Sequence, residues 1–206
     1  GMGIYLNPGN AAFKEALCSE IYVDKTGLIK YTNSVLGTKQ KNICVSRPRR
    51  FGKSMAAEML LAYYCCGVDS SELFSGLEIA DDSSFRQHLN QYDVIFLNIQ
   101  DFLSRAENVE LMVSCLQDAV IYDLKKKYQL QLESCRKLDM VSLLEEIYRV
   151  TGQGFVFIID EWDCIFRERK YNKEIQNAYL DCLRSLLKDK VYVKLAYMTG
   201  ILAIKK

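Results

Sequence analysis

The sequence predicts an α/β domain with a mostly parallel sheet that helices cover on both faces. Apolar runs of strand length alternate with segments of helical period along the 206 residues. This alternation indicates a parallel sheet, because parallel strands need a long, usually helical crossover between them. Phe155–Ile159 is a near-continuous apolar run, which is typical of a strand buried on both faces. No repeat or low-complexity segment interrupts the pattern, and the length suits one domain over residues 1–206.

The elements can be assigned in order along the chain. Residues 1–10 are rich in Gly, Asn and Pro, which predicts irregular chain. We expect residues 1–40 to form an N-terminal helical extension and residues 41–206 to form the nucleotide-binding core, truncated at its C-terminal end. Helices are expected over residues 11–18, 25–37, 82–90, 107–128, 139–151 and 172–188, with another that begins at Met55 and stops near Gly67. Strands are expected at Ile43–Ser46, residues 92–99, Phe155–Ile159 and Val191–Met198.

The long helix over residues 107–128 is expected to bury one apolar face. The residues of that face are Leu111, Cys115, Leu116, Ala119 and Tyr122. Its end, Lys125–Lys127, suits the negative end of the helix dipole and is expected to be solvated.

Charge and hydropathy exclude few functions. The chain has 27 basic and 26 acidic residues, a net charge of +1, which argues neither for nor against nucleic acid as a partner. No apolar run approaches the roughly 20 residues that a bilayer crossing needs, and no secretory segment is visible, so no membrane is expected as a partner.

Eight cysteines occur without a C-x-x-C pair, and His88 is the only histidine. A structural zinc site is therefore not expected. Most of the cysteines fall within apolar periodic segments, where we expect the thiols to act as small core groups. This usage predicts a reducing, cytoplasmic compartment.

The segment Ile43–Ser54 joins an apolar strand, a basic loop and a Gly-Lys-Ser helix start. This order is the setting of a phosphate-binding loop, because the N–H groups and the dipole of the helix start attract anions. Lys53 is expected to reach the outer phosphates and Ser54 to ligate Mg²⁺. The residues expected to hold the nucleotide are Arg47, Pro48, Arg49, Arg50, Phe51, Gly52, Lys53, Ser54 and Met55.

The loop departs from the general pattern G-x-x-x-x-G-K-[ST] at one position. Arg47 stands where the pattern has its first glycine, which often serves a tight turn at positive φ. Pro48 favours extended geometry at Arg47, which predicts a turn built another way. On spacing alone, a basic turn followed by an N-capped helix is the competing interpretation.

Asp160 and Glu161 directly follow the apolar strand Phe155–Ile159. Ligands of open parallel sheets bind beyond the carboxyl ends of the strands, so both carboxylates are expected at the edge that carries Lys53. Asp160 is expected to position Mg²⁺, directly or through water, and Glu161 to orient and polarise an attacking water. Alone, the pair also fits a strand that ends in a charged turn; together with the loop it favours a nucleotide site.

A third polar position ends the last expected strand. Thr199 lies at the same expected edge, directly before Gly200. Its hydroxyl either holds the attacking water or contacts the γ-phosphate, or Thr199 is only a turn residue. We count Thr199 with Glu161 and Lys53 as a candidate catalytic residue.

These segments resemble the bacterial AAA-ATPase-like family of P-loop proteins. The segments that carry the resemblance are Val23-Asp24-Lys25-Thr26, Arg47–Ser54, Ile159-Asp160-Glu161-Trp162-Asp163 and Thr199-Gly200. The resemblance covers essentially the whole chain, and the loop is its most specific part. Arg47 belongs to the pattern of that family, whereas Trp162 replaces its usual Tyr.

The resemblance implies a three-layer P-loop NTPase core of the additional-strand, catalytic-glutamate type with sheet order 5-1-4-3-2. We expect the order 1-4-3-2 here, with the fifth strand and the helical lid missing and Ile43–Ser46 at an open edge. Similar proteins are longer, and many end in a nuclease-like domain, so we expect the N-terminal part of a larger protein. An open edge also predicts self-association, because unpaired strands bind other chains.

The expected activity is Mg²⁺-dependent ATP hydrolysis, with the missing C-terminal domain as a partner. Two alternatives are a regulatory nucleotide-binding module with little turnover and a nucleic-acid-binding domain that uses the basic loop. Arg47, Arg49 and Arg50 suit nucleotide phosphates, an acidic domain or a nucleic-acid backbone, and they also suit solvated charge that supports the turn. In the alternative in which the basic loop binds a nucleic-acid backbone, nucleic acid is a partner through the full-length protein.

Two further positions have no derived mechanism. Asp24 and Lys25 either frame the nucleotide base or pin the N-terminal helices to the core, and we favour the second. Spacing alone suggests that Asp163 supports the metal from a second layer.

Overall fold

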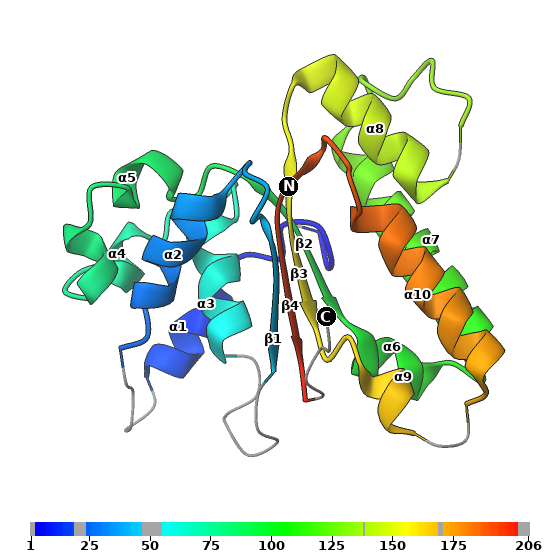
Figure 1. Ribbon diagram of the computed structural model, residues 1–206. Coiled ribbons are helices and arrows are strands. Elements are labelled where there is room, and N and C mark those ends of the chain that lie inside the picture. The colour runs from blue at the N-terminus through cyan, green and yellow to red at the C-terminus, as the bar shows by residue number, and fades with distance from the viewer. Residues whose placement is uncertain (1–2, 19–23, 47–54, 138, 169–170, 202–206) are drawn as a thin grey trace.

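The computed structural model describes residues 3–18, 24–46, 55–137, 139–168 and 171–201. A sheet of four parallel strands in the order β1-β4-β3-β2 lies at its centre. The strands are β1 (Asn42–Ser46), β2 (Asp93–Asn98), β3 (Phe155–Asp160) and β4 (Val193–Gly200). The α/β class and the order 1-4-3-2 are therefore confirmed. Figure 1 shows the sheet between two layers of helices.

The first helical layer lies against one face of the sheet (Figure 1). It contains α1 (Ala11–Leu17), α2 (Gly27–Val35), α3 (Met55–Tyr64), α4 (Ser71–Phe74), the 3₁₀ turn η1 (Glu78–Asp81) and α5 (Phe85–His88). The polar helix expected over residues 82–90 is thus only one turn long. In β3, Val156 and Ile158 point to this layer and pack with α3 residues such as Leu60.

The second layer covers the opposite face (Figure 1). It contains α6 (Ile99–Arg105), α7 (Val109–Lys127), α8 (Met140–Thr151), α9 (Cys164–Arg167) and α10 (Lys173–Leu187). Along β3, Phe155, Phe157 and Ile159 alternate with Val156 and Ile158, and they pack against the second helical layer. All six residues of β3 are buried, as the apolar run predicts.

Short-range signals place the helix ends. The side chains of Asn108, Asp139 and Asn172 each accept a hydrogen bond from the backbone N–H three residues on, at 2.8 to 3.0 Å. These are N-caps, which satisfy donors that the first helical turn leaves unpaired. Gly152 ends α8 in the left-handed region at φ 71°, where a glycine carries no steric penalty.

The buried face of α7 differs from the expected one. Leu111 is 45% exposed and Tyr122 67% exposed, whereas Met112, Val120 and Leu124 are buried. Apolar residues occupy both stripes at helical spacing, so periodicity alone could not choose between them. Packing against α8 and α10 decides which stripe faces the core.

The N-terminal segment lies against β2. Leu6 forms an antiparallel bridge with Ile95 of β2, and the N–H groups of Asn7 and Phe96 donate to Val94 and Tyr5 carbonyls at 2.8 Å. This short extended stretch covers the outer edge of β2. Residues 3–10 form no helix or strand, as expected, and the bridge at Leu6 fixes this irregular chain against β2.

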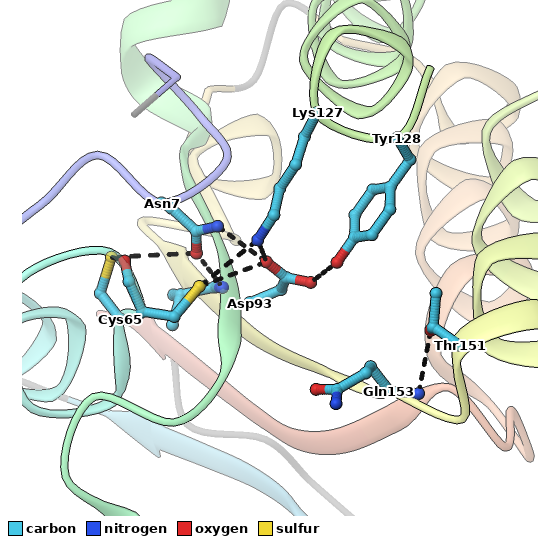
Figure 2. Close-up of polar contacts among 9 residues, drawn as sticks. Asn7, Cys65, Asp93, Lys127, Tyr128, Thr151 and Gln153 are labelled. Carbon is cyan, nitrogen blue, oxygen red and sulfur yellow. Dashed lines mark hydrogen bonds and ion pairs between the residues drawn. The ribbon is translucent and has the colours of Figure 1, made fainter. Parts of the chain in front are cut away.

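Lys127 is not a solvated helix end. It forms an ion pair with the buried Asp93 at the start of β2, and its ammonium lies 3.4 Å from the sulfur of Cys66. Tyr128 and Asn7 also donate to the Asp93 carboxylate, and Figure 2 shows these side chains converging on it. The cluster of Asn7, Cys66, Asp93, Lys127 and Tyr128 joins α7, β2 and the N-terminal segment. It is called the Asp93 cluster below.

The cysteines are distributed differently from the expectation. All eight are free, and only Cys65 and Cys164 are buried. Most of the thiols therefore lie outside the core. The expectation failed because apolar periodicity does not show which stripe of a helix is buried.

None of the helices in the described residues has the length and apolar content that a membrane crossing requires.

Candidate nucleotide site

Three of the expected site residues, Asp160, Glu161 and Thr199, meet at the carboxyl edge of the sheet. Asp160 is the last residue of β3, and Thr199 lies near the end of β4, where it pairs with Val45 of β1. Ser46, the last residue of β1, pairs with Gly200. Parallel strands thus bring positions more than a hundred residues apart to one edge. This edge, at the carboxyl ends of the strands, is where open parallel sheets bind ligands. Met55 is the first residue of α3.

The expected phosphate loop directly follows Ser46 in the sequence and precedes α3. Its residues Arg47, Pro48, Arg49, Arg50, Phe51, Gly52, Lys53 and Ser54 lie outside the described residues. Their roles therefore stay predictions. The described flanks, a core strand before the loop and a helix after it, have the order that a phosphate loop needs.

Thr199 is hydrogen-bonded to both of the expected acidic positions. Its side chain is fully buried, and its hydroxyl donates to Oδ1 of Asp160. The same hydroxyl oxygen accepts the backbone N–H of Glu161 at 3.4 Å. Because a hydroxyl has one proton to donate, Thr199 uses it on Asp160 and fixes the orientation of that carboxylate.

Glu161 has a backbone conformation that side chains disfavour. Its φ is 54°, in the left-handed region, and it is half-buried at the edge of the sheet. A non-glycine residue in this region costs energy and persists only where neighbouring contacts hold it. Here the Trp162 N–H donates to the Thr199 carbonyl at 3.0 Å, and the Tyr179 hydroxyl donates to the Trp162 carbonyl at 2.5 Å.

Asp163 faces the end of β4. Its Oδ2 accepts the N–H of Ile201 at 2.9 Å, and its Oδ1 lies 3.5 Å from Nε of Arg167. The side chain is fully buried. A Cβ at Gly200 would lie 2.6 Å from Cγ of Asp163, so this close approach requires glycine. Asp163 thus ties two strand ends together, a contact that spacing in the sequence did not reveal.

Ser46 and Arg167 are site residues that the sequence reasoning missed. The Ser46 hydroxyl donates to the carbonyl of Ile201 at 2.8 Å, which links β1 to the same backbone residue that Asp163 holds. A serine at the end of a strand is common, and a lone Arg after an acidic motif reads as surface charge. Neither carries a local signal that would have identified it.

The N-terminal motif pins two helical elements together. Oδ1 of Asp24 accepts the N–H and the hydroxyl of Thr26 at 2.9 and 2.6 Å, and Oδ2 accepts the N–H of Glu78 at 2.8 Å. Thr26 in turn accepts the N–H of Ile79 at 3.1 Å. These contacts join the start of α2 to η1 and agree with the favoured structural interpretation of Asp24.

The described donor atoms at this edge fit a hard cation. Asp160 supplies carboxylate oxygens, and Mg²⁺ prefers one or two carboxylates with water and substrate phosphates over a cage of protein ligands. The described residues contain no cluster of three or more His, Cys, Asp or Glu with metal-binding geometry.

Comparison with known proteins identifies the family. The model of the family described as Predicted AAA-ATPase matches residues 11–206, and the chain belongs to this family. No functionally curated protein matches it. Among solved structures, it is similar to the pCW3 conjugation coupling protein TcpA in its monomer form with ATPγS. That similarity has 10% identity and a TM-score of 0.35, covers 82% of this chain and 44% of that one, and is too low to bear on function.

Proposed function

We propose that this chain is an ATP-binding P-loop domain that hydrolyses ATP with Mg²⁺. The observation that carries the proposal is the arrangement of Asp160, Glu161 and Thr199 at the carboxyl edge. Thr199 lies on β4, next to the strand that leads into Arg47–Ser54, and Asp160 and Glu161 lie at the end of β3, the following strand in the sheet. Family membership over residues 11–206 supports the same assignment.

Each part of the edge has a proposed role. The loop amides and Lys53 hold the phosphates, with Arg47–Met55 as the binding segment. Ser54 and Asp160 hold Mg²⁺, which when bound neutralises phosphate charge. Glu161 orients and activates the attacking water, and Thr199 keeps the Asp160 carboxylate in place. Catalysis then comes from positioning and electrostatics, as expected for phosphoryl transfer.

The wider context belongs to the same proposal. We infer that the chain acts as part of a larger protein, whose further domain contacts this one and provides any access to nucleic acid. A regulatory module would use the same edge and bind ATP with little turnover. Turnover measured on this chain and on a longer protein separates these two functions.

The test compares two variants of the site with two exposed controls. Lys53→Ala should abolish ATP binding in calorimetric titration, because the outer phosphates lose their cation. Glu161→Gln should bind ATP normally and lose about 100-fold or more in turnover, because an amide cannot accept the proton. The controls Lys39→Ala and Glu133→Gln change exposed side chains and should behave as wild type. Unchanged ATP affinity in Lys53→Ala would overturn the assignment.

A further inference from the structure

One backbone residue joins three strand ends at the carboxyl edge. The N–H of Ile201 donates to Oδ2 of Asp163 in the turn after β3, at 2.9 Å. The carbonyl of Ile201 accepts the hydroxyl of Ser46 at the end of β1, at 2.8 Å. A continuous path therefore runs from Asp163 through Ile201 to Ser46. We call these three residues the Ile201 link.

The Asp163 end of this link is buried and tightly enclosed. The Asp163 side chain is fully buried, and Arg167, with 14% of its side chain exposed, places Nε 3.5 Å from Oδ1. Gly200 leaves room for the carboxylate, since a Cβ there would lie 2.6 Å from Cγ of Asp163. A buried carboxylate is costly unless it is paired and hydrogen-bonded. These contacts hold it against the β4 end.

The link acts on the turn that carries Glu161. Glu161 lies two residues before Asp163 and has the strained φ of 54°. Such a conformation relaxes unless several contacts hold it. The Trp162 N–H bond to the Thr199 carbonyl holds the middle of the turn, and Asp163 holds its end. Without Asp163, the turn can shift and take the Glu161 carboxylate with it.

We propose that Asp163 is a positioning residue for the hydrolysis reaction and that it acts through Ile201 and Ser46. The Ile201 link holds the turn that carries Glu161 in register with the strand that enters the phosphate loop. Arg167 keeps the Asp163 carboxylate in the orientation that this requires. The inference rests on the proposed function and adds a coupling between the two halves of the site.

The test measures turnover and ATP affinity separately. Asp163→Ala should lower kcat about ten- to a hundredfold, the range expected when a catalytic group is misplaced by about 1 Å, with the ATP dissociation constant within about threefold of wild type. Asp163→Asn should recover part of kcat, because its amide oxygen still accepts the Ile201 N–H, whereas its NH2 group cannot accept from Arg167. Ser46→Ala should also lower kcat. The matched controls Asp181→Ala and Ser34→Ala change exposed residues and should not.

A double-variant cycle tests whether the effects share one path. Ser46→Ala combined with Asp163→Ala should be no worse than the more severe single variant, because both break the same link. Additive losses, or a kcat unchanged by Asp163→Ala, would overturn the proposal. If Asp163→Ala does not fold, Gly200→Ala displaces the carboxylate with its charge intact and should lower kcat in the same way; an unchanged kcat there would equally overturn it.

Amide hydrogen exchange separates this proposal from the proposed function. If the wild type neither binds nor hydrolyses ATP, the assignment of function fails, and the link is judged by the exchange rate of the Ile201 N–H. Asp163→Ala should raise that rate about tenfold or more, because a hydrogen bond that protects the amide is lost. An unchanged Ile201 rate would show that Asp163 does not hold the end of β4.

Discussion

At the scale of single residues, the site is built from side chains and from one strained backbone. Thr199 orients Asp160 through its hydroxyl, while Glu161 adopts a left-handed φ of 54° that its side chain does not favour. Strain of this kind costs about 1–3 kcal/mol and is typical of functional positions. The strained residue is also the one that we propose activates water.

The strain at Glu161 can be measured with two substitutions. Glu161→Gly and Glu161→Ala both remove the carboxylate, but only glycine adopts positive φ without a steric penalty. The glycine variant should therefore be more stable than the alanine variant by about 1 kcal/mol. Chemical denaturation of both proteins checks this. Equal stability, or a more stable alanine variant, would show that the turn relaxes without strain.

At the scale of elements, the Asp93 cluster connects α7 to β2 at the end of the sheet opposite the site. Burial alone would raise the pKa of Asp93, but hydrogen bonds from Lys127, Tyr128 and Asn7 outweigh burial and hold the pKa below its usual range. Burial would likewise lower the pKa of Lys127, and its contacts with Asp93 raise it instead. Both groups therefore stay charged in the folded protein.

Removal of the cation should destabilise the fold. Lys127→Met leaves the buried Asp93 without its counter-charge and should lower the free energy of unfolding by about 3 kcal/mol. The neighbouring Lys126 is exposed, so Lys126→Met should change it by less than about 0.5 kcal/mol. Urea denaturation of the two variants measures the difference. Similar values for both would mean that the ion pair contributes nothing net.

The same pair predicts a pH dependence of stability. Because the folded pKa of Asp93 lies below its ordinary value of 3.8, the contribution of Asp93 is present above that pH and is lost as the pH falls through the folded pKa. The raised pKa of Lys127 gives a contribution that is present below 10.5 and is lost as the pH rises through the folded value. Below pH 4, wild type should therefore lose stability more steeply than Asp93→Asn. Parallel curves of unfolding free energy against pH would contradict this.

At the scale of the whole molecule, the two edges of the sheet differ. The N-terminal stretch Tyr5–Asn7 covers β2, and Asp123 holds it by accepting the N–H groups of Tyr5 and Leu6 at 2.9 and 3.1 Å. No strand in the described residues pairs with the outer edge of β1. Next to that edge lies an apolar groove of about 360 Å³, lined by residues of β1, β4 and α10 and by Trp162.

We expect the open edge of β1 to pair with a second copy of the chain. Under reducing conditions, sedimentation velocity should show association that rises with concentration, because unpaired strand edges bind other strands. Cys44→Lys places a charge on the exposed face of β1 and should weaken the association. Cys115→Lys makes the same change at an exposed site on α7 and should not. A chain that stays monomeric at all concentrations, or equal effects of both variants, would contradict the expectation.

The sequence by itself determined the α/β class, the parallel strands and most of the helix boundaries. These features depend on neighbours within a few residues: the apolar run of β3, the caps at Asn108 and Asp139, and the glycine that ends α8 at Gly152. The resemblance added the strand order, which the sheet confirms. Asp160 and Thr199 could be predicted at one edge because all carboxyl ends of a parallel sheet meet there.

Only the tertiary structure decided the contacts between residues that are distant in the sequence. The Ile201 link joins positions 38 and 155 residues apart. Lys127 forms an ion pair with Asp93, 34 residues earlier in the chain. Packing also selects which of two apolar stripes of α7 is buried. The strain at Glu161 also depends on contacts from β4 and α10. Periodicity and propensity report the local preference of the backbone, whereas these contacts form only when the sheet brings separate strand ends together.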